Sequence, residues 1–196
     1  PYGSSGFSLG AGSTSVPFEQ SLSGLSPGTK YYYCAIAQNP YGLAYGELLS
    51  FTTPALAPTV STGSASVASG TAATLQGSAN PNGDATTGWF RYGTASPGTC
   101  NDTFGTRAPG MGGSSLGAGS SGASFSQAIT GLLPATTYYF CAIAANSMGT
   151  AWGSVQTFIT PAAPTAVTVS ATSIANSSAT LNGTGNPNRA STSGWF

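Results

Sequence analysis

The stretch that decides the fold is GLLPATTYYFCAIA at residues 131–144. Tyr, Phe, Thr and Ile favour β-strands, and successive side chains of a strand point to opposite faces of the sheet. The pattern therefore predicts a strand over 136–146. One face would hold Tyr138, Phe140, Ala142 and Ala144, and the other Tyr139, Cys141, Ile143 and Ala145.

The same stretch occurs 107 residues earlier, as GLSPGTKYYYCAIA at residues 24–37. FTTP at 51–54 returns as FITP at 158–161 with the same offset. Two further motifs, NPN at 80–82 and GWF at 88–90, return at 186–188 and 194–196 with an offset of 106. One repeat therefore spans about 107 residues, which is the size of a single β-sandwich domain.

On this period the chain divides into three parts. Residues 55–161 form one complete repeat, which we call the central repeat. Residues 1–54, the N-terminal segment, are the C-terminal part of a repeat, and residues 162–196, the C-terminal segment, are the N-terminal part of the next. Two interpretations follow. The chain is an excerpt of a longer tandem protein, or the C-terminal segment of one copy completes the N-terminal segment of another in a head-to-tail polymer.

Composition supports an all-β chain with few charges. Only 4% of the residues are charged, against about a quarter in an average domain, and 28 Gly and 13 Pro punctuate the sequence. Aromatic residues make up 11% of the chain and can supply a packed core. The punctuation predicts seven strands in the central repeat, near 59–67, 71–79, 85–92, 99–106, 123–130, 136–146 and 151–160.

A spaced Leu-Pro-Thr-Tyr pattern leads into the strand at 136–146 and into its counterpart one repeat earlier. A buried Tyr at this position, with its hydroxyl bonded back to the preceding chain, is the tyrosine corner of Greek-key sandwiches. The residues of this fold signature are Leu132, Pro134, Thr136 and Tyr138, and Leu25, Pro27, Thr29 and Tyr31.

Together with ATLQG at 73–77, NPNG at 80–83 and WFRYG at 89–93, this pattern resembles the fibronectin type III family, in the form common in bacterial surface and secreted proteins. The resemblance covers essentially the whole chain. It implies tandem immunoglobulin-like, seven-stranded Greek-key β-sandwiches that act as spacers or adhesion modules. Two features depart from the animal members: Leu75 stands where they usually carry Trp, and the segment 93–122 is long and rich in Gly and Ser.

The three cysteines predict one disulfide. Cys34 and Cys141 are equivalent, and the equivalent of Cys100 in the preceding repeat would fall before residue 1. We therefore expect a Cys100–Cys141 bond and a partner for Cys34 outside this sequence; the alternative is that the thiols are free. A disulfide implies an oxidising compartment, so the expected location is extracellular or at the cell surface.

Catalysis is not expected. The chain has no His, and its carboxylates, Glu19, Glu47, Asp84 and Asp102, are scattered. No catalytic residues, metal ligands or cofactor are therefore predicted. A net charge of zero gives no basic surface for nucleic acid. No apolar run is long enough to predict a membrane span.

Several aromatic residues suggest contact surfaces. If the core face is as predicted, Trp89, Arg91, Tyr139 and Ile143 point outward together. The disulfide-linked segment 93–122 would cover them as a second small core, or they would contact a neighbouring subunit or stack on sugars. Trp152 and Tyr45 lie on the last hairpin of their repeats, where junction packing is expected ahead of ligand binding.

The sequence thus predicts a structural component of an extracellular fibre, stalk or sheath, whose partners are other copies or neighbouring repeats. The alternative is a set of non-catalytic spacer or binding modules of a secreted polysaccharide-degrading enzyme, or an adhesin. Three sequons are candidate glycosylation sites, at Asn101, Asn176 and Asn182. The nearly uncharged surface is expected to be either buried in an assembly or coated with glycan. Glycans are also an expected partner of the exposed aromatic residues.

Overall fold

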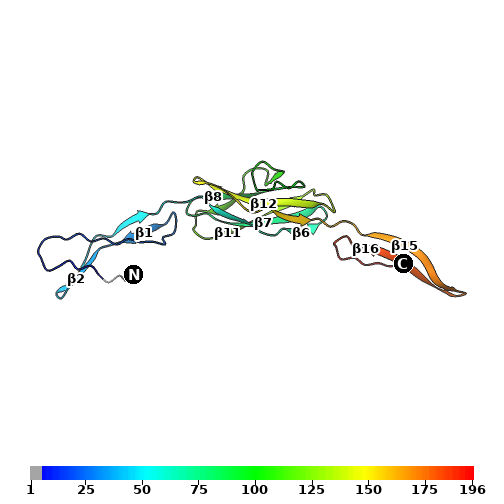
Figure 1. The fold of residues 1–196 in the computed structure, drawn as a ribbon, viewed down its shortest axis with the longest axis horizontal. Helices are drawn as coiled ribbons and strands as arrows, with labels where there is room; N and C mark the ends of the chain where they lie inside the picture. Colours follow the sequence, from blue (N-terminus) through cyan, green and yellow to red (C-terminus); the bar gives the residue numbers. More distant parts are fainter. Residues whose placement is uncertain (1–5) are drawn as a thin grey trace.

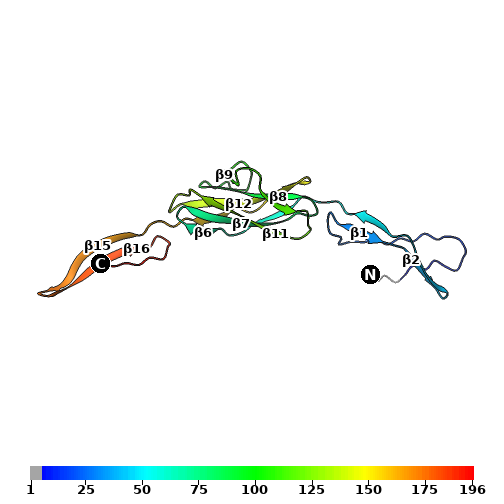
Figure 2. The same ribbon diagram turned by 180° about the vertical axis from the view of Figure 1, so that it is seen from behind.

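A computed structural model describes residues 6–196 as an elongated row of β-structure, with the central repeat in the middle and one segment at either end (Figures 1 and 2). The described residues contain strands and turns but no helix. The fold class is therefore all-β, as the sequence predicts.

The central repeat is a sandwich of two antiparallel sheets. The first has the order β11–β7–β5, with β6 also paired to β7. Its strands are β5 (Thr59–Thr62), β6 (Ser66–Ser69), β7 (Ala72–Asn80) and β11 (Ala123–Thr130). The second has the order β10–β8–β12–β13, with β9 on β8 and β14 on β12. Its strands are β8 (Thr86–Gly93), β9 (Thr106–Ala108), β10 (Ser114–Gly117), β12 (Thr137–Asn146), β13 (Gly149–Trp152) and β14 (Gln156–Ile159).

The predicted strands differ from these in three places. The spans expected at 59–67 and 151–160 are each divided into two short strands. The strand expected at 99–106 is wrong: this span is mostly a turn, and β9 and β10 come later. The reason is local, because the Asn101 side-chain oxygen accepts hydrogen bonds from the Thr103 and Phe104 amides, both at 3.0 Å. Such an Asx turn competes with an extended strand.

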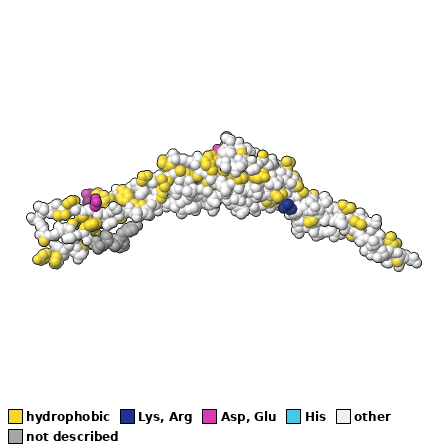
Figure 3. Space-filling view, in the orientation of Figure 1, with side chains coloured by type: hydrophobic (Ala, Val, Ile, Leu, Met, Phe, Trp, Pro, Cys, Tyr) yellow, Lys and Arg dark blue, Asp and Glu magenta, His cyan; other side chains and the backbone are white. Residues whose placement is uncertain are grey.

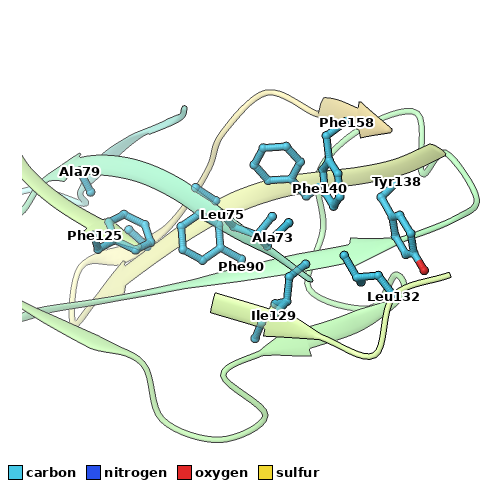
Figure 4. Close-up of a cluster of buried hydrophobic side chains, with 13 residues drawn as sticks. Ala73, Leu75, Ala79, Phe90, Phe125, Ile129, Leu132, Tyr138, Phe140 and Phe158 are labelled. Carbon is cyan, nitrogen blue, oxygen red and sulfur yellow. The ribbon is translucent and has the colours of Figure 1, made fainter. Parts of the chain in front are cut away.

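The core lies between the two sheets and is built from aromatic side chains (Figure 4). Tyr138 stacks on Phe158, with ring centroids 5.4 Å apart, and Phe90 packs on Phe125 at 4.8 Å. The predicted inward face of β12 is confirmed, since all four of its residues belong to this cluster. The buried residues are Ala73, Leu75, Ala79, Phe90, Ala108, Phe125, Ile129, Leu132, Tyr138, Phe140, Ala142, Ala144 and Phe158.

The flanking segments reproduce strand pairs of the central repeat, but neither has the facing sheet that would complete a sandwich. Tyr31 pairs with Phe51 as Tyr138 pairs with Phe158. The N-terminal segment has β1 (Lys30–Tyr33) paired with β4 (Leu49–Thr52), and β2 (Ile36–Asn39) paired with β3 (Gly42–Tyr45). The C-terminal segment is the hairpin of β15 (Thr165–Ala175) and β16 (Ser178–Asn186).

Candidate functional site

The tyrosine corner forms in both repeats that contain it. The hydroxyl of Tyr138 accepts a hydrogen bond from the Leu133 amide, and that of Tyr31 accepts one from the Ser26 amide, both at 2.9 Å. The predicted backward bond of this Tyr is therefore present. Because the contact spans only five residues, it forms even where the rest of the sandwich is missing.

The end of each repeat is fastened to this corner by a threonine. Thr53 Oγ1 donates to the Ser26 carbonyl at 2.6 Å and accepts from the Thr29 amide at 2.9 Å. Thr160 makes the equivalent bonds in the central repeat, to the Leu133 carbonyl at 2.6 Å and from the Thr136 amide at 3.0 Å. The linker that follows each threonine therefore starts from a fixed point.

The other end of the first linker is held by the central repeat. The Leu56 amide donates to the Asn82 carbonyl at 3.1 Å, and the Asn82 side chain donates to the Ala57 carbonyl at 2.8 Å. The Asn146 side chain donates to the Leu56 carbonyl at 2.9 Å. Pro54 and Pro58, which flank these residues, each have a fixed φ. The short connection is thus tied from both sides.

The second linker repeats part of this arrangement. The Ala162 amide donates to the Asn188 carbonyl at 3.2 Å, and the Asn188 side chain bonds the Ala163 carbonyl. Asn188 is the equivalent of Asn82 in the NPN motif. The sequence shows that motif twice, but its linker-binding role was not predicted, because the bonded partners lie about 25 residues away.

Asp84 braces the loops around the first linker. Its carboxylate accepts from the Ser147 hydroxyl at 2.6 Å and from the Ser147 amide at 2.9 Å. These bonds, and a third from the Ala85 amide, hold the pKa of Asp84 below its usual value. Asp84 therefore joins the turn that carries Asn82 to the turn beside Asn146, as expected of a structural rather than a catalytic carboxylate.

The first junction also has a backbone contact that requires glycine. Gly28, in the corner loop of the N-terminal segment, lies directly against Gly83, in the NPNG turn of the central repeat. A Cβ on Gly83 would come within 2.6 Å of the Gly28 nitrogen, so no larger residue fits there. At the second junction Ala135 and Arg189 occupy the equivalent positions, both with positive φ. The two junctions therefore cannot close in the same way.

The outer face of β8 and β12 is covered by the loop before β9, within the segment 93–122, while β9 and β10 of the same segment extend the sheet beside β8. The structure contains the Cys100–Cys141 disulfide, with the two Cα atoms 5.9 Å apart. Trp89, Cys141 and Ile143 form a second buried cluster, against which Phe104 packs. Of the alternatives for this face, the structure shows a second small core under the covering loop. Tyr139, on the same face, is half-buried. Cys34 is a free, exposed cysteine.

Charged side chains bind the covering segment to the outer face of β8. Asp102 Oδ1 accepts from Trp89 Nε1 at 2.9 Å and from Arg91 Nε at 2.8 Å. Partial burial raises the pKa of Asp102, but the bonds from Arg91 and Trp89 and the charges of Arg91 and Arg107 outweigh it and leave the pKa below its usual value. The Arg107 guanidinium lies 4.7 Å from the centre of the Trp89 ring. Two of the four basic residues are therefore used inside the repeat, a role that the sequence did not reveal.

The remaining predicted residues are scattered. Trp152 and Tyr45 are exposed, on β13 and β3. Among the sequons, Asn101 is occupied by its Asx turn, and the Asn182 side chain donates to the Ser170 carbonyl at 2.8 Å. Asn176 lies in the exposed turn between β15 and β16.

One cleft of the central repeat has an uncharged lining of mostly small residues together with three aromatic side chains. It has a volume of about 490 Å³, between the loop 93–97 and the tyrosine corner. Tyr92, Phe104 and Tyr138 are among its lining residues. Across residues 6–196 there is no cluster of three or more His, Cys, Asp or Glu side chains that could hold a metal ion. None of the described elements is a helix long and apolar enough to cross a membrane.

No family model matches the chain, and no curated protein matches it in sequence. Solved structures do show similarity. The long form of the sensor domain of the anti-sigma factor RsgI4 from Pseudobacteroides cellulosolvens is 27% identical with a TM-score of 0.37, over 59% of this chain and 97% of that one. The FN1–FN3 domains of chicken CNTN1 are 19% identical with a TM-score of 0.39, over 70% of this chain and 44% of that one. Domains d3–d4 of the rat CD45 extracellular region are 17% identical with a TM-score of 0.35, over 78% of this chain and 79% of that one.

Proposed function

We propose that this chain is a stiff spacer of an extracellular fibre, stalk or sheath built from tandem β-sandwich repeats. The observation that carries the proposal is the first linker. It follows Thr53, which is hydrogen-bonded to the tyrosine corner, and it is itself bonded to Asn82 and Asn146 of the central repeat. Neighbouring domains usually move relative to each other unless something restrains them. Here hydrogen bonds, two prolines and a glycine contact provide that restraint.

The use of the polar groups fits a spacer. Asp84, Asp102, Arg91 and Arg107 are all the charged residues of the central repeat, and each of them bonds within it. A disulfide that ties down a long loop suits an oxidising, extracellular setting. Such a bond also adds resistance to unfolding under load, because it restrains the unfolded chain.

Exposed apolar side chains on the flanking segments support assembly from repeats (Figure 3). Tyr33 and Phe51 stand exposed where their equivalents Phe140 and Phe158 are buried, and Leu181 and Phe196 are exposed where Leu75 and Phe90 are buried. The bare face of each segment therefore matches the strands that the other segment supplies. We propose that a hairpin like β15–β16 covers β1 and β4, either from contiguous repeats or from a second copy in a head-to-tail polymer.

The experiment is small-angle X-ray scattering on size-separated protein. The Asn82→Ala/Asn146→Ala variant releases the first linker, and Asn176→Ala, in an exposed turn, is the matched control. If the chain is a stiff spacer, the double variant should have a broader distribution of interatomic distances within the molecule than the native protein. The control should match the native protein. An unchanged distribution in the double variant would reject the spacer proposal.

A second candidate, a carbohydrate-binding module, is favoured only by the aromatic cleft beside Tyr92 and Phe104. Aromatic faces stack on sugar rings, and the cleft presents no charge. If the chain binds a glycan on an array and the Tyr92→Ala variant does not, the result would support carbohydrate binding in addition to the spacer role. An array without binding would reject it.

A further inference from the structure

Strand β11 has a long, open edge. It pairs with β7 over eight consecutive residues without a break in register, and no other strand pairs with it in the described part of the chain. It contains no proline and no charged residue. The opposite edge of the same sheet is divided between β5 and β6, each of four residues. An uninterrupted, uncharged edge is a template for pairing with another strand.

The hydrogen-bond pattern identifies the free backbone groups. The Gly63 amide, beyond β5, donates to the Gln76 carbonyl at 2.8 Å, so Gln76 faces β5. In an antiparallel sheet the backbone groups of successive residues point alternately to the two neighbours, so Gly77 faces β11, where it pairs with Phe125. Every second residue from Phe125 therefore bonds to β7. The amides that point to the open edge belong to Ser124, Ser126, Ala128 and Thr130.

The sequence of the neighbouring repeat carries edge-blocking residues at the equivalent positions. Its equivalents of Ser124 and Ser126 are Pro17 and Glu19, from the 107-residue offset. A proline at the first position removes an outward N–H, and a glutamate at the second adds a charge. Proteins use both devices to keep sheet edges from pairing. The central repeat lacks both, which distinguishes its edge as open.

We propose that β11 pairs antiparallel with β11 of a second copy of this chain, about a two-fold axis, and joins two central repeats side by side. In this register Ser124 faces Thr130 of the partner subunit, and Ser126 faces Ala128 of the partner subunit. The same edge on both copies satisfies an isologous contact. No like charges meet across it, and the exposed side chains of this strand are small. Figure 1 shows β11 next to β7 in the lower layer of the sandwich.

Amide hydrogen exchange of the full 196-residue chain, measured by NMR at low and high protein concentration, tests this pairing. At high concentration the amides of Ser124, Ser126, Ala128 and Thr130 should exchange about tenfold more slowly when nine-tenths of the chains are paired. The amides of Phe125, Gln127 and Ile129 are already bonded to β7 and should change little. Equal exchange of the four outward amides at both concentrations overturns the proposal.

Variants taken from the neighbouring repeat provide the control. Ser124→Pro and Ser126→Glu should each abolish the concentration-dependent protection, while the uncharged Ser126→Gln should keep it. If Ser124→Pro does not fold, the comparison of Ser126→Glu with Ser126→Gln decides. Head-to-tail association would instead protect β1, β4, β15 and β16 and would be insensitive to these substitutions. Protection of β11 that survives Ser126→Glu unchanged contradicts the pairing.

Discussion

The central repeat and the N-terminal segment share a sequence pattern but differ in burial. Phe140 is 0% exposed and its equivalent Tyr33 is 51% exposed; Phe158 is 7% exposed and Phe51 is 38% exposed. Yet both regions have the same tyrosine corner, the same threonine hydrogen bonds to that corner and the same strand register. The comparison separates the features that each half of a repeat forms by itself from those that need the whole repeat. Hydrogen bonds and register are set locally, whereas burial needs the first half of the repeat.

The largest expected effect comes from removing equivalent aromatic side chains. Phe140→Ala leaves a cavity between the two sheets and should lower the free energy of unfolding of the central repeat by about 3–5 kcal/mol. Tyr33→Ala removes a half-exposed ring and should cost less than about 0.5 kcal/mol. Denaturant unfolding of the full chain measures both. Similar losses for the two variants would mean that the N-terminal segment has a covered core of its own.

The cysteines give the next largest difference. Cys100→Ala/Cys141→Ala should destabilise the central repeat by about 2–4 kcal/mol, because the unfolded chain is no longer cross-linked, and should expose Trp89 to solvent. Cys34→Ala, at the position equivalent to Cys141, should have no effect on unfolding. Thermal unfolding and Trp fluorescence report the two changes. A destabilising Cys34→Ala would contradict the free state of that thiol.

The tyrosine corner gives a smaller effect that depends on its surroundings. Tyr138→Phe leaves the Leu133 amide without its acceptor and should lower the free energy of unfolding by about 0.5–1.5 kcal/mol. Tyr31→Phe removes the same bond from the Ser26 amide, so that amide should exchange faster while global unfolding stays unchanged. Hydrogen exchange and denaturation of each variant check this. If the Ser26 amide of the native protein already exchanges as fast as an unprotected amide, the corner does not form in the N-terminal segment.

The smallest expected effect is on acid stability. The folded pKa of Asp102 is lowered, so its contribution is present above the unfolded pKa near 4 and is lost as the pH falls through the folded value. Asp102→Asn should therefore flatten the decline in stability on the acid side. The Trp89 indole proton, which bonds this carboxylate, should report the titration by NMR. A midpoint above the usual Asp value would contradict the lowered pKa.

The parts of the fold that were predictable from sequence are those with a local period. The strand at 123–130 follows from the Gly and Pro punctuation, and the two faces of 136–146 follow from alternation. The segment 93–122 has no period, and the contacts that hold it, Arg107 on Trp89 and Asp102 on Arg91, join it to side chains on the outer face of β8. Nothing in the local sequence of the segment indicates these partners. Its strand at 99–106 was therefore misplaced.

The candidate site was predictable only in part. The disulfide followed from the repeat, because equivalence left Cys100 and Cys141 as the one pair within a complete copy. The linker contacts did not. Asn146 and the Leu56 carbonyl that it bonds are 90 residues apart, and nothing in either local sequence indicates that they meet.

Residual dipolar couplings test the stiffness of the first junction most directly. If the linker is held as described, amides of β1–β4 and of the central repeat should fit a single alignment tensor of one magnitude. The Asn82→Ala/Asn146→Ala variant should require two tensors. Native couplings in β1–β4 that are averaged toward zero, while those of the central repeat stay large, would contradict the account.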